Sequence, residues 1–499
     1  MDYSGLQNGS DVRGIAVDTE SSRANLTVEA ATRIGYAFAE YLMRQKGKEQ
    51  IRVALGRDPR ISGEKLLNAI ASGLIQAGAE VNDIMLASTP AMFMSTVLEG
   101  FEFDGSVMVT ASHLPFDRNG FKFFTCDGGY EKKDIAEILK RAGELESVTY
   151  KHFELKKLEF MPVYAEYICN KVRQGANAES YMKPLDGYKI VVDAANGGGG
   201  FFANSVLVPL GADVSGSIYL EPDGHFPNHS PNPEQEEAME QLAKATLAAK
   251  ADLGIIFDPD VDRAAVVLSD GREINRNKLI AMMADIVLRD VPGSIIVTDS
   301  ITSTGLAKFI AERGGVHRRF RRGYRNVINE AIRLNNEGYE CLLAMETSGH
   351  GALRENYFLD DGAYIVAKLL IELARVKSQG KTLESLIDGL NEPAEATEVR
   401  FKLPVDDFKA VGKNVLDIFT ERCIRSDKIV PEKENYEGIR ANVPEFDGWF
   451  LLRMSLHDPV MPLNIESDSV GGVRQIAKLI YGLLDGIEGI DTESLKKLL

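Results

Sequence analysis

The chain has 499 residues, of which 44% are hydrophobic and 26% charged, as in ordinary soluble globular proteins. This length predicts about three or four domains. Because 74 acidic residues outnumber 57 basic ones, the net charge of −17 argues against nucleic acid or an anionic membrane as a general partner.

Two further features of the composition indicate a cytoplasmic protein. No apolar run approaches the ~18 residues of a transmembrane helix, and the start of the chain lacks the basic and apolar regions of a signal peptide. The cysteines are scattered singly without a Cys-x-x-Cys motif, which favours reduced thiols over disulfides or a zinc site. They are Cys126, Cys169, Cys341 and Cys423.

Helices and strands alternate over most of the chain. Thr27 is expected to cap a helix whose apolar face includes Phe38 and Leu42 and which ends near Gly47. Apolar strands are expected at 51–55, 190–192 and 295–297, and each leads to an aspartate: Asp58, Asp193 and Asp299. This recurrence predicts three related α/β domains.

Changes in composition indicate where the domains end. Charged residues near Lys156 precede a helix-like stretch, a turn at 269–271 precedes the third unit, and Asn391-Glu392-Pro393 interrupts the chain before an alternating strand at 398–403. Short strands and a terminal helix with Ile476 and Ile480 on its apolar face follow, which is typical of an α+β domain. The expected domains are α/β at 1–155, 156–270 and 271–392, and α+β at 393–499.

Three carboxylates, Asp258, Asp260 and Asp262, lie between the apolar strands expected at 253–257 and 264–268. Side chains at alternate positions of an extended chain point to one side, so these carboxylates would repel one another unless a hard cation such as Mg²⁺ lay among them. An EF-hand is excluded because Arg263 and Ser269 replace the required Gly and Glu. A solvated acidic turn remains the alternative.

A possible nucleophile lies in Thr110-Ala111-Ser112-His113, which follows an apolar strand expected at 107–109. The segment places the Ser112 hydroxyl beside an imidazole. A helix cap or a turn is the alternative role for a serine after a strand.

Together with further motifs, these segments resemble the α-D-phosphohexomutases, the family of phosphomannomutase and phosphoglucomutase. The motifs are spread along almost the whole chain, and their order and spacing match the family's. They are Asp11-Val12-Arg13-Gly14, Gly56–Gly63, Thr110–His113 with Asn119–Lys122, Pro222–Pro227 with Pro231–Pro233, Asp258–Arg263, Glu346-Thr347-Ser348-Gly349-His350, and Gly448-Trp449 with Arg453-Met454-Ser455.

The resemblance implies four domains around a central cleft and a reaction that moves a phosphoryl group between the 1- and 6-oxygens of a hexose. Ser112 would be the phosphorylated serine, and with Asp258, Asp260 and Asp262 it would bind Mg²⁺. Arg263 would add fixed positive charge beside the transferring group. The candidates for proton transfer or charge stabilisation are Arg13, His113, Lys122 and His350. A hexose 1,6-bisphosphate would serve as activator.

The resemblance also implies a substrate site for a phosphorylated hexose. Glu346, Thr347 and Ser348 would contact the sugar, and this form of the loop is most like that of enzymes for glucose and mannose phosphates. Arg453, Ser455 and His457 would hold the phosphate that is not transferred. An arginine cluster would either form a solvated basic face or, with Arg325 in a glycine-centred loop, line the phosphate side of the site: Arg318, Arg319, Arg321, Arg322 and Arg325.

Some positions depart from the family's pattern. Leu114-Pro115 replaces the usual Asn-Pro after the serine, and Leu456-His457-Asp458 replaces the usual residues of the phosphate loop. The leading hypothesis is a Mg²⁺-dependent mutase for glucose or mannose phosphates. The alternatives are a catalytically weak sugar-phosphate-binding protein on the same fold, a phosphoglucosamine mutase, and a metal-dependent phosphatase. The pattern does not predict an oligomeric state.

Overall fold

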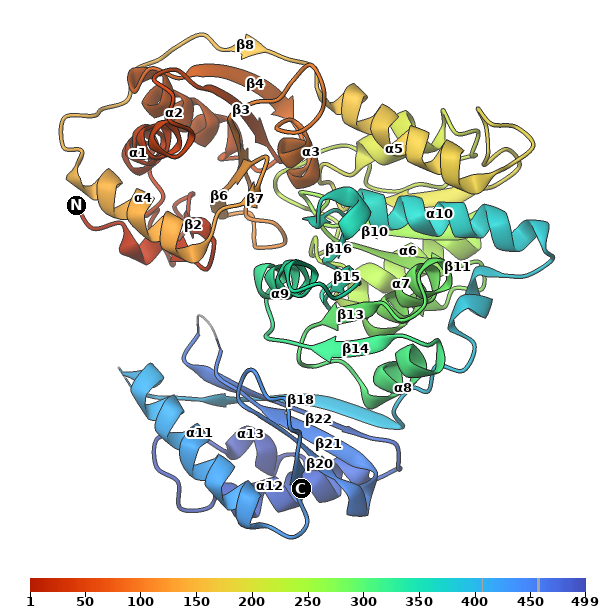
Figure 1. Ribbon diagram of the computed structural model, residues 1–499. Coiled ribbons are helices and arrows are strands. Elements are labelled where there is room, and N and C mark those ends of the chain that lie inside the picture. Colours follow the sequence, from red (N-terminus) through yellow and green to blue (C-terminus); the bar gives the residue numbers. More distant parts are fainter. Residues whose placement is uncertain (406, 456–457) are drawn as a thin grey trace. The chain divides into compact units, whose positions relative to one another are not determined.

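The computed structural model describes residues 1–405, 407–455 and 458–499 (Figure 1). The predicted phosphate ligand His457 lies outside the described residues. The chain forms two compact units, residues 1–279 with 348–386 and residues 280–347 with 387–499, and each is considered by itself. In the described part, no helix is both long enough and apolar enough to cross a membrane.

The first unit begins with a mixed sheet in the order β1-β2-β6-β5-β3-β4-β8, with β7 paired to β6. β3, β4 and β5 run parallel, whereas β6 is antiparallel to both β5 and β2. The strands are β1 (Gln7–Asn8), β2 (Asp11–Ile15), β3 (Arg52–Arg57), β4 (Glu80–Leu86), β5 (Gly105–Val109), β6 (Arg118–Thr125), β7 (Gly128–Gly129) and β8 (Lys156–Lys157).

Helices pack against this sheet, as Figure 1 shows in its red and orange part. They are α1 (Val28–Lys46), α2 (Gly63–Gln76), α3 (Thr89–Met94) and α4 (Lys132–Glu144). The expected first helix is confirmed: the Thr27 hydroxyl accepts a hydrogen bond from the amide of Ala30, and Gly47 ends α1 in the left-handed conformation. Phe38 and Leu42 of α1 are fully buried in the core.

The rest of the first unit contains a second sheet in the order β12-β11-β10-β9. β9 and β10 are parallel, and β10 and β11 form an antiparallel pair from Leu253↔Leu268 to Phe257↔Ala264. The elements are α5 (Met161–Ala176), β9 (Ile190–Asp193), α6 (Glu236–Ala249), β10 (Leu253–Phe257), β11 (Ala264–Leu268), β12 (Glu273–Ile274), β16 (Gly351–Leu353), β17 (Leu359–Asp360) and α10 (Gly362–Ser378). The Asp361 carboxylate, which caps α10, accepts a hydrogen bond from the Tyr164 hydroxyl of α5.

The second unit contains β13 between the parallel strands β14 and β15. Its elements in this part are most of α7 (Arg276–Asp290), β13 (Ile295–Thr298), α8 (Thr304–Glu312), β14 (Val316–Arg319), α9 (Tyr324–Asn336) and β15 (Cys341–Met345). The segment 271–392, expected as one domain, is thus divided between the two compact units. The four domain boundaries stay predictions.

The C-terminal part of the second unit is an antiparallel sheet in the order β18-β22-β21-β20-β19, with helices on one face (Figure 1). The elements are β18 (Glu395–Lys402), α11 (Phe408–Arg425), β19 (Val430–Pro431), β20 (Ile439–Val443), β21 (Gly448–Leu452), β22 (Val460–Ser467), α12 (Gly472–Leu484) and α13 (Glu493–Lys496). Ile476 and Ile480 of α12 are fully buried against this sheet. The expected α+β character is confirmed.

A buried aspartate occurs at the carboxyl end of one strand in each α/β part. Asp58 follows β3, Asp193 ends β9 and Asp299 follows β13, and each is 0% exposed. Ligands of open α/β sheets bind at these strand ends. The pattern of an apolar strand followed by an aspartate, which recurs three times in the sequence, therefore places each aspartate at the same position of its sheet.

Candidate active site

Ser112 lies in a tightly held loop after β5. Its backbone has a φ of +49°, in the left-handed region that residues other than glycine seldom adopt, and its amide donates to the Thr110 hydroxyl over 2.8 Å. The Arg60 guanidinium donates to the carbonyl of Ser112 and, over 2.6 Å, to those of Leu114 and Pro115. The loop conformation is thus imposed by its surroundings.

The Ser112 hydroxyl faces the acidic loop between β10 and β11. It donates to Asp258 Oδ2 over 2.7 Å, and Arg263 Nη2 lies 3.4 Å from its oxygen. His113 Nδ1 is also 3.4 Å away. The nucleophile, carboxylate and arginine expected from the sequence therefore meet in one place within the first unit.

The three loop carboxylates converge, but the extended chain expected between them is wrong. Residues 258–262 form a turn in which the Val261 amide donates to the Asp258 carbonyl over 3.1 Å. Val261 has a φ of +64°, so the chain reverses there instead of running straight. Ligand oxygens of Asp258, Asp260 and Asp262 lie within 4.8 Å of one another because the turn, and not the alternation of a strand, gathers them.

Two cations offset part of this negative charge. Lys122 Nζ, on β6, contacts Asp262 and lies 3.2 Å from Asp260 Oδ2, and Arg263 Nε lies 3.1 Å from Asp258 Oδ2. All five side chains are buried. The three buried carboxylates therefore share two direct ion-pair partners.

The ionisation of the loop follows from these contacts. Burial and the neighbouring Asp262 and Asp260 hold the pKa of Asp258 well above its usual range. Burial also acts to raise the pKa of Asp260, but Lys122 and the hydrogen bond from Thr89 outweigh it and lower that pKa. The repulsion therefore acts mainly on Asp258, whereas Lys122 stabilises the charged form of Asp260.

The loop fits a hard divalent cation. Asp260 Oδ1 and Asp262 Oδ1 are buried without a hydrogen-bond partner, which is costly for a carboxylate oxygen. Mg²⁺ prefers oxygen ligands and would satisfy both atoms while neutralising the excess charge. The donor set, its burial and its unsatisfied oxygens together indicate a metal site.

The other predicted catalytic residues of the first unit surround this loop. Arg13 on β2 donates to the Thr110 carbonyl over 2.6 Å and to Asp11 over 2.9 Å. His350 Nε2 lies 3.6 Å from Asp262 Oδ1, and its Nδ1 is 2.9 Å from the Ser348 hydroxyl. These side chains belong to the same constellation as Ser112.

His113 is a neutral imidazole at working pH. Burial lowers its pKa to about 2, and the positive charges of Arg263 and Arg13 act in the same direction. The ring can therefore form hydrogen bonds without adding charge.

Glu346 and Thr347 belong to the second unit, after β15. Glu346 Oε1 accepts a hydrogen bond from the Gly323 amide over 2.6 Å, and the Thr347 hydroxyl donates to Asp299 over 2.7 Å. Ser348 lies in the first unit, so the division between the units passes through the predicted sugar loop.

Arg453, also in the second unit, is a buried arginine whose guanidinium is incompletely hydrogen-bonded. It is 6% exposed, and its buried Nε has no hydrogen-bond partner. Its Nη1 lies 3.4 Å from the Met454 carbonyl. The amide of the neighbouring Ser455 donates to the Val460 carbonyl over 3.0 Å.

In the arginine cluster, Arg318 and Arg319 are half-buried and Arg321 is exposed. Arg318 pairs with Glu434 over 2.6 Å and Arg319 with Glu432 over 3.6 Å, while Arg321 donates to the Tyr436 carbonyl. These contacts join β14 and the following segment to the segment before β20 within the second unit. Arg325 is half-buried on the first turn of α9.

Arg60, Thr89 and Asn232 also shape the site, although no role was predicted for them from the sequence. Arg60 pairs with Asp58 and holds the serine loop, the Thr89 hydroxyl donates to Asp260 over 2.5 Å, and Asn232 accepts from Arg263 over 3.3 Å. Arg60 and Asn232 stand inside the quoted motifs, so the signal was present. Thr89 carries no such signal, because only the fold brings it to the loop.

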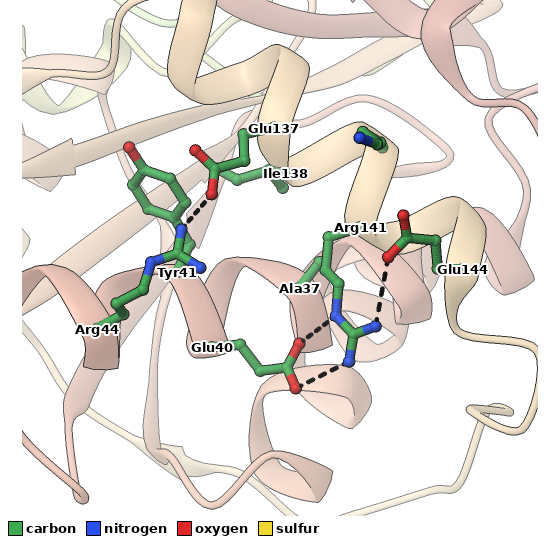
Figure 2. A pocket seen from close by; sticks show the side chains of 9 residues that line it. Ala37, Glu40, Tyr41, Arg44, Glu137, Ile138, Arg141 and Glu144 are labelled. Atoms are coloured by element: carbon green, nitrogen blue, oxygen red, sulfur yellow. Dashed lines mark hydrogen bonds and ion pairs between the residues drawn. The ribbon is translucent and has the colours of Figure 1, made fainter.

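A groove of about 410 Å³ lies elsewhere, between α1 and α4 (Figure 2). Four of its charged side chains form two pairs: Arg141 donates to Glu40 over 2.7 and 3.1 Å, and Arg44 contacts Glu137. None of the motif residues lines it. The groove is therefore separate from the candidate site.

Comparison with known proteins identifies the family. The chain matches the models of phosphoglucomutase/phosphomannomutase alpha/beta/alpha domains I, II and III over residues 5–148, 162–271 and 275–393. It is 32% identical to a phosphoglucomutase/phosphomannomutase of Thermococcus kodakarensis over 95% of this chain and 97% of the relative. It is 30% identical to a phosphoglucomutase of Neisseria gonorrhoeae over 95% of both chains.

Solved structures agree with this assignment. The crystal structure of a phosphoglucomutase/phosphomannomutase family protein from Burkholderia thailandensis covers 98% of both chains with a TM-score of 0.79 and 27% identity. A putative phosphomannomutase from Thermus thermophilus shares the fold, with a TM-score of 0.72 at 19% identity over 97% of this chain and all of that one. With its three matched domains and near full-length relatives, the chain belongs to the phosphoglucomutase/phosphomannomutase family of α-D-phosphohexomutases and is a mutase, an enzyme of phosphoryl transfer.

Proposed function

We propose that the protein interconverts the 1-phosphate and 6-phosphate of glucose or mannose through a phosphorylated Ser112 and a hexose 1,6-bisphosphate. The observation that carries this proposal is the contact of the Ser112 hydroxyl with both Asp258 and Arg263 in a buried loop. Phosphoryl transfer requires positioning and neutralisation of spread negative charge more than covalent chemistry from the protein. Two related proteins are named for both sugars, which supports the substrate class.

In the first step, the 6-hydroxyl of the hexose 1-phosphate would attack the phosphorus of phosphoserine, and the Ser112 oxygen would leave. In the second, Ser112 would attack the 1-phosphoryl group of the bisphosphate and release the 6-phosphate. The serine phosphate is thereby regenerated, so no net phosphate is consumed. The free bisphosphate would rephosphorylate enzyme that has lost its phosphate.

Mg²⁺ is the proposed metal; bound by Asp258, Asp260, Asp262 and the serine phosphate, it would neutralise charge on the transferring group. Arg263 would donate to the serine oxygen as negative charge develops there. Lys122, which bridges two loop carboxylates, would keep the site's charge balanced.

His350 is the best placed of the four predicted residues to carry the proton of the attacking hydroxyl. Arg13 stays charged at working pH, and Lys122 is already paired with two carboxylates. A pKa of about 2 makes His113 too weak a base. His350 has one ring nitrogen toward Ser348 and the other toward Asp262, an arrangement that can relay a proton.

For the substrate, we propose that Glu346, Thr347 and Ser348 bind sugar hydroxyls. Arg325, Arg453, Ser455 and His457 would bind the phosphate that is not transferred. A buried, incompletely bonded Arg453 supports this role, since a phosphate oxygen would satisfy its Nε. The four domains proposed at 1–155, 156–270, 271–392 and 393–499 would supply the serine, metal, sugar and phosphate loops respectively.

A coupled assay tests the proposal directly. Glucose 1-phosphate, mannose 1-phosphate and glucosamine 1-phosphate are supplied in turn, with Mg²⁺ and the matching bisphosphate, and formation of each 6-phosphate is measured. Turnover of glucose or mannose phosphate, lost in Ser112→Ala, is expected. Turnover of glucosamine phosphate alone would contradict the substrate, and release of inorganic phosphate as the main product would indicate a phosphatase.

A further inference from the structure

A buried histidine and aspartate lie directly behind the acidic loop. His229 Nε2 is 2.9 Å from Asp193 Oδ2, and both side chains are 0% exposed. Asp193 ends β9 opposite Ile256 of β10, the strand that leads into Asp258. Neither residue belongs to the predicted catalytic or substrate-binding set.

The hydrogen bonds of His229 determine its protonation. Its Nε2 faces a carboxylate, and its Nδ1 faces the Ser230 carbonyl over 2.8 Å. Both partners are acceptors, so both ring nitrogens must carry a hydrogen. A doubly protonated imidazole is a cation and would form a buried ion pair with Asp193.

The groups packed around the ring favour this cation. Burial acts to lower the pKa of His229, but the hydrogen bond and charge of Asp193, the Ser230 carbonyl and the charge of Glu237 on α6 outweigh it and raise that pKa. The edge-to-face ring of Tyr219, 5.5 Å away, carries no charge, and its hydroxyl donates to Gln241.

One side of the pair supports the back of the acidic loop. Asp193 Oδ1 accepts from the Ala195 amide over 2.8 Å and so fixes a turn in which Ala195 has a φ of +49°. In the same turn, the Gly198 amide donates to the Pro259 carbonyl over 2.8 Å. A Cβ added to Gly197 would lie 2.5 Å from Pro259 Cα, so this turn packs directly on the acidic loop.

The other side of the pair supports Arg263. His229 anchors the Ser230 carbonyl, and the Asn232 amide donates to that same carbonyl over 2.8 Å. Asn232 Oδ1 then accepts from Arg263 Nη1 over 3.3 Å, and Glu234 lies 3.6 Å from that nitrogen. The guanidinium that reaches Ser112 is therefore held from behind by the segment that His229 anchors.

We propose that Asp193 and the doubly protonated His229 form a positioning ion pair that holds Pro259 and Arg263, and with them the acidic loop, in register with Ser112 for phosphoryl transfer. The expected effect of this ion pair on kcat rests on the proposed function, in which Arg263 and Ser112 take part in phosphoryl transfer. The charge state of His229 is independent of that function.

The first test reads the charge state in the unmodified protein. Histidine labelled with ¹⁵N is incorporated, and the His229 signals are identified by their loss in His229→Gln. We expect both ring nitrogens to carry hydrogens at pH 7.5, when an ordinary exposed imidazole has lost one. A His229 ring with one bare nitrogen at that pH would overturn the ion pair whatever the enzyme's substrate.

The second test separates positioning from general stability. His229→Gln and Asp193→Asn should each lower kcat about 10- to 100-fold, as is typical for partners behind a metal or catalytic group, with KM changed less than about threefold. Glu240→Gln, at an exposed position of α6, is the matched control and should leave kcat and KM unchanged. An unchanged kcat in both site variants would refute the proposal.

A double-mutant cycle tests whether His229 affects kcat by positioning Arg263. In an Arg263→Ala background, His229→Gln should lower kcat by less than about twofold, because the group that it positions is gone. The same fold loss in both backgrounds would assign His229 a purely structural role. Circular dichroism and unfolding midpoints identify variants that fail to fold, and Asp193→Asn, which keeps the side-chain shape, provides the second variant.

Discussion

Removal of divalent cations should destabilise the protein, because the three buried carboxylates of the acidic loop then repel one another and have only Lys122 and Arg263 as direct ion-pair partners among the described residues. Two like charges about 4 Å apart repel by about 4 kcal/mol at an effective dielectric constant of 20, and the ligand oxygens of the acidic loop lie within 4.8 Å of one another. An ion that binds only the folded state stabilises it by about 2.7 kcal/mol at 100 times its Kd. For a large compact unit this corresponds to a rise of about 5 °C in the unfolding midpoint.

The assay is thermal unfolding in excess EDTA and in millimolar MgCl₂. Wild-type protein should gain about 5 °C with Mg²⁺, and Asp260→Asn should gain half of that or less, since one ligand charge is lost. Glu240→Gln has the same change of charge on an exposed helix and should keep the full gain. Equal midpoints of the wild type in EDTA and Mg²⁺, or a full gain in Asp260→Asn, would refute the metal site.

Three further substitutions probe other parts of the molecule. Lys122→Met should lower kcat about 10²- to 10³-fold in the coupled assay, because two loop carboxylates lose their shared cation; activity near wild type would exclude that role. Arg453→Ala should raise KM at least tenfold for every substrate with less effect on kcat, whereas an unchanged KM would remove it from the phosphate site. Burial raises the pKa of Glu466 to about 7 in the folded protein, although the charge of Arg440 opposes this shift. The protonated carboxyl therefore contributes fully to the free energy of unfolding below pH 4.5, and this contribution is lost as the pH rises to about 7. Glu466→Gln should therefore exceed the wild type in unfolding free energy by about 1 to 3 kcal/mol at pH 8 and by much less at pH 5 in urea titrations, and a gap that does not widen with pH would contradict this.

The regular elements could be predicted because their signals are local. The apolar strands at 253–257 and 264–268 match β10 and β11 residue for residue, and the cap at Thr27 and the glycine at 47 begin and end α1. Burial periodicity and cap chemistry depend on neighbours in sequence, so no tertiary information is needed.

The convergence of the three loop carboxylates was predicted, but its cause was not. Spacing at alternate positions indicated a strand, whereas the structure has a turn with Val261 in the left-handed region. Contacts from distant segments hold that turn: Gly197 and Gly198 pack on Pro259, and the Gly362 amide donates to the Val261 carbonyl over 3.1 Å. Such long-range contacts leave no periodic signal in a single sequence.

Residues that support the site through other residues were the least predictable. Arg60 reaches the serine loop across 52 positions of sequence, and Thr89 reaches Asp260 across 171. The arginine cluster was ambiguous for the same reason, since the partners of Arg318 and Arg319 near residue 433 become neighbours only in the folded unit. The reactive groups of the site are therefore easier to predict from the sequence than the residues that hold them in place.

If Ser112 carries the transferred phosphoryl group, the intact mass of the protein must change after incubation with a hexose 1,6-bisphosphate and Mg²⁺. We expect the mass of one added phosphoryl group in the wild type and none in Ser112→Ala. The wild type should lose this phosphate when the hexose monophosphate is in large excess. An added phosphoryl group that persists in Ser112→Ala would show that another residue is phosphorylated.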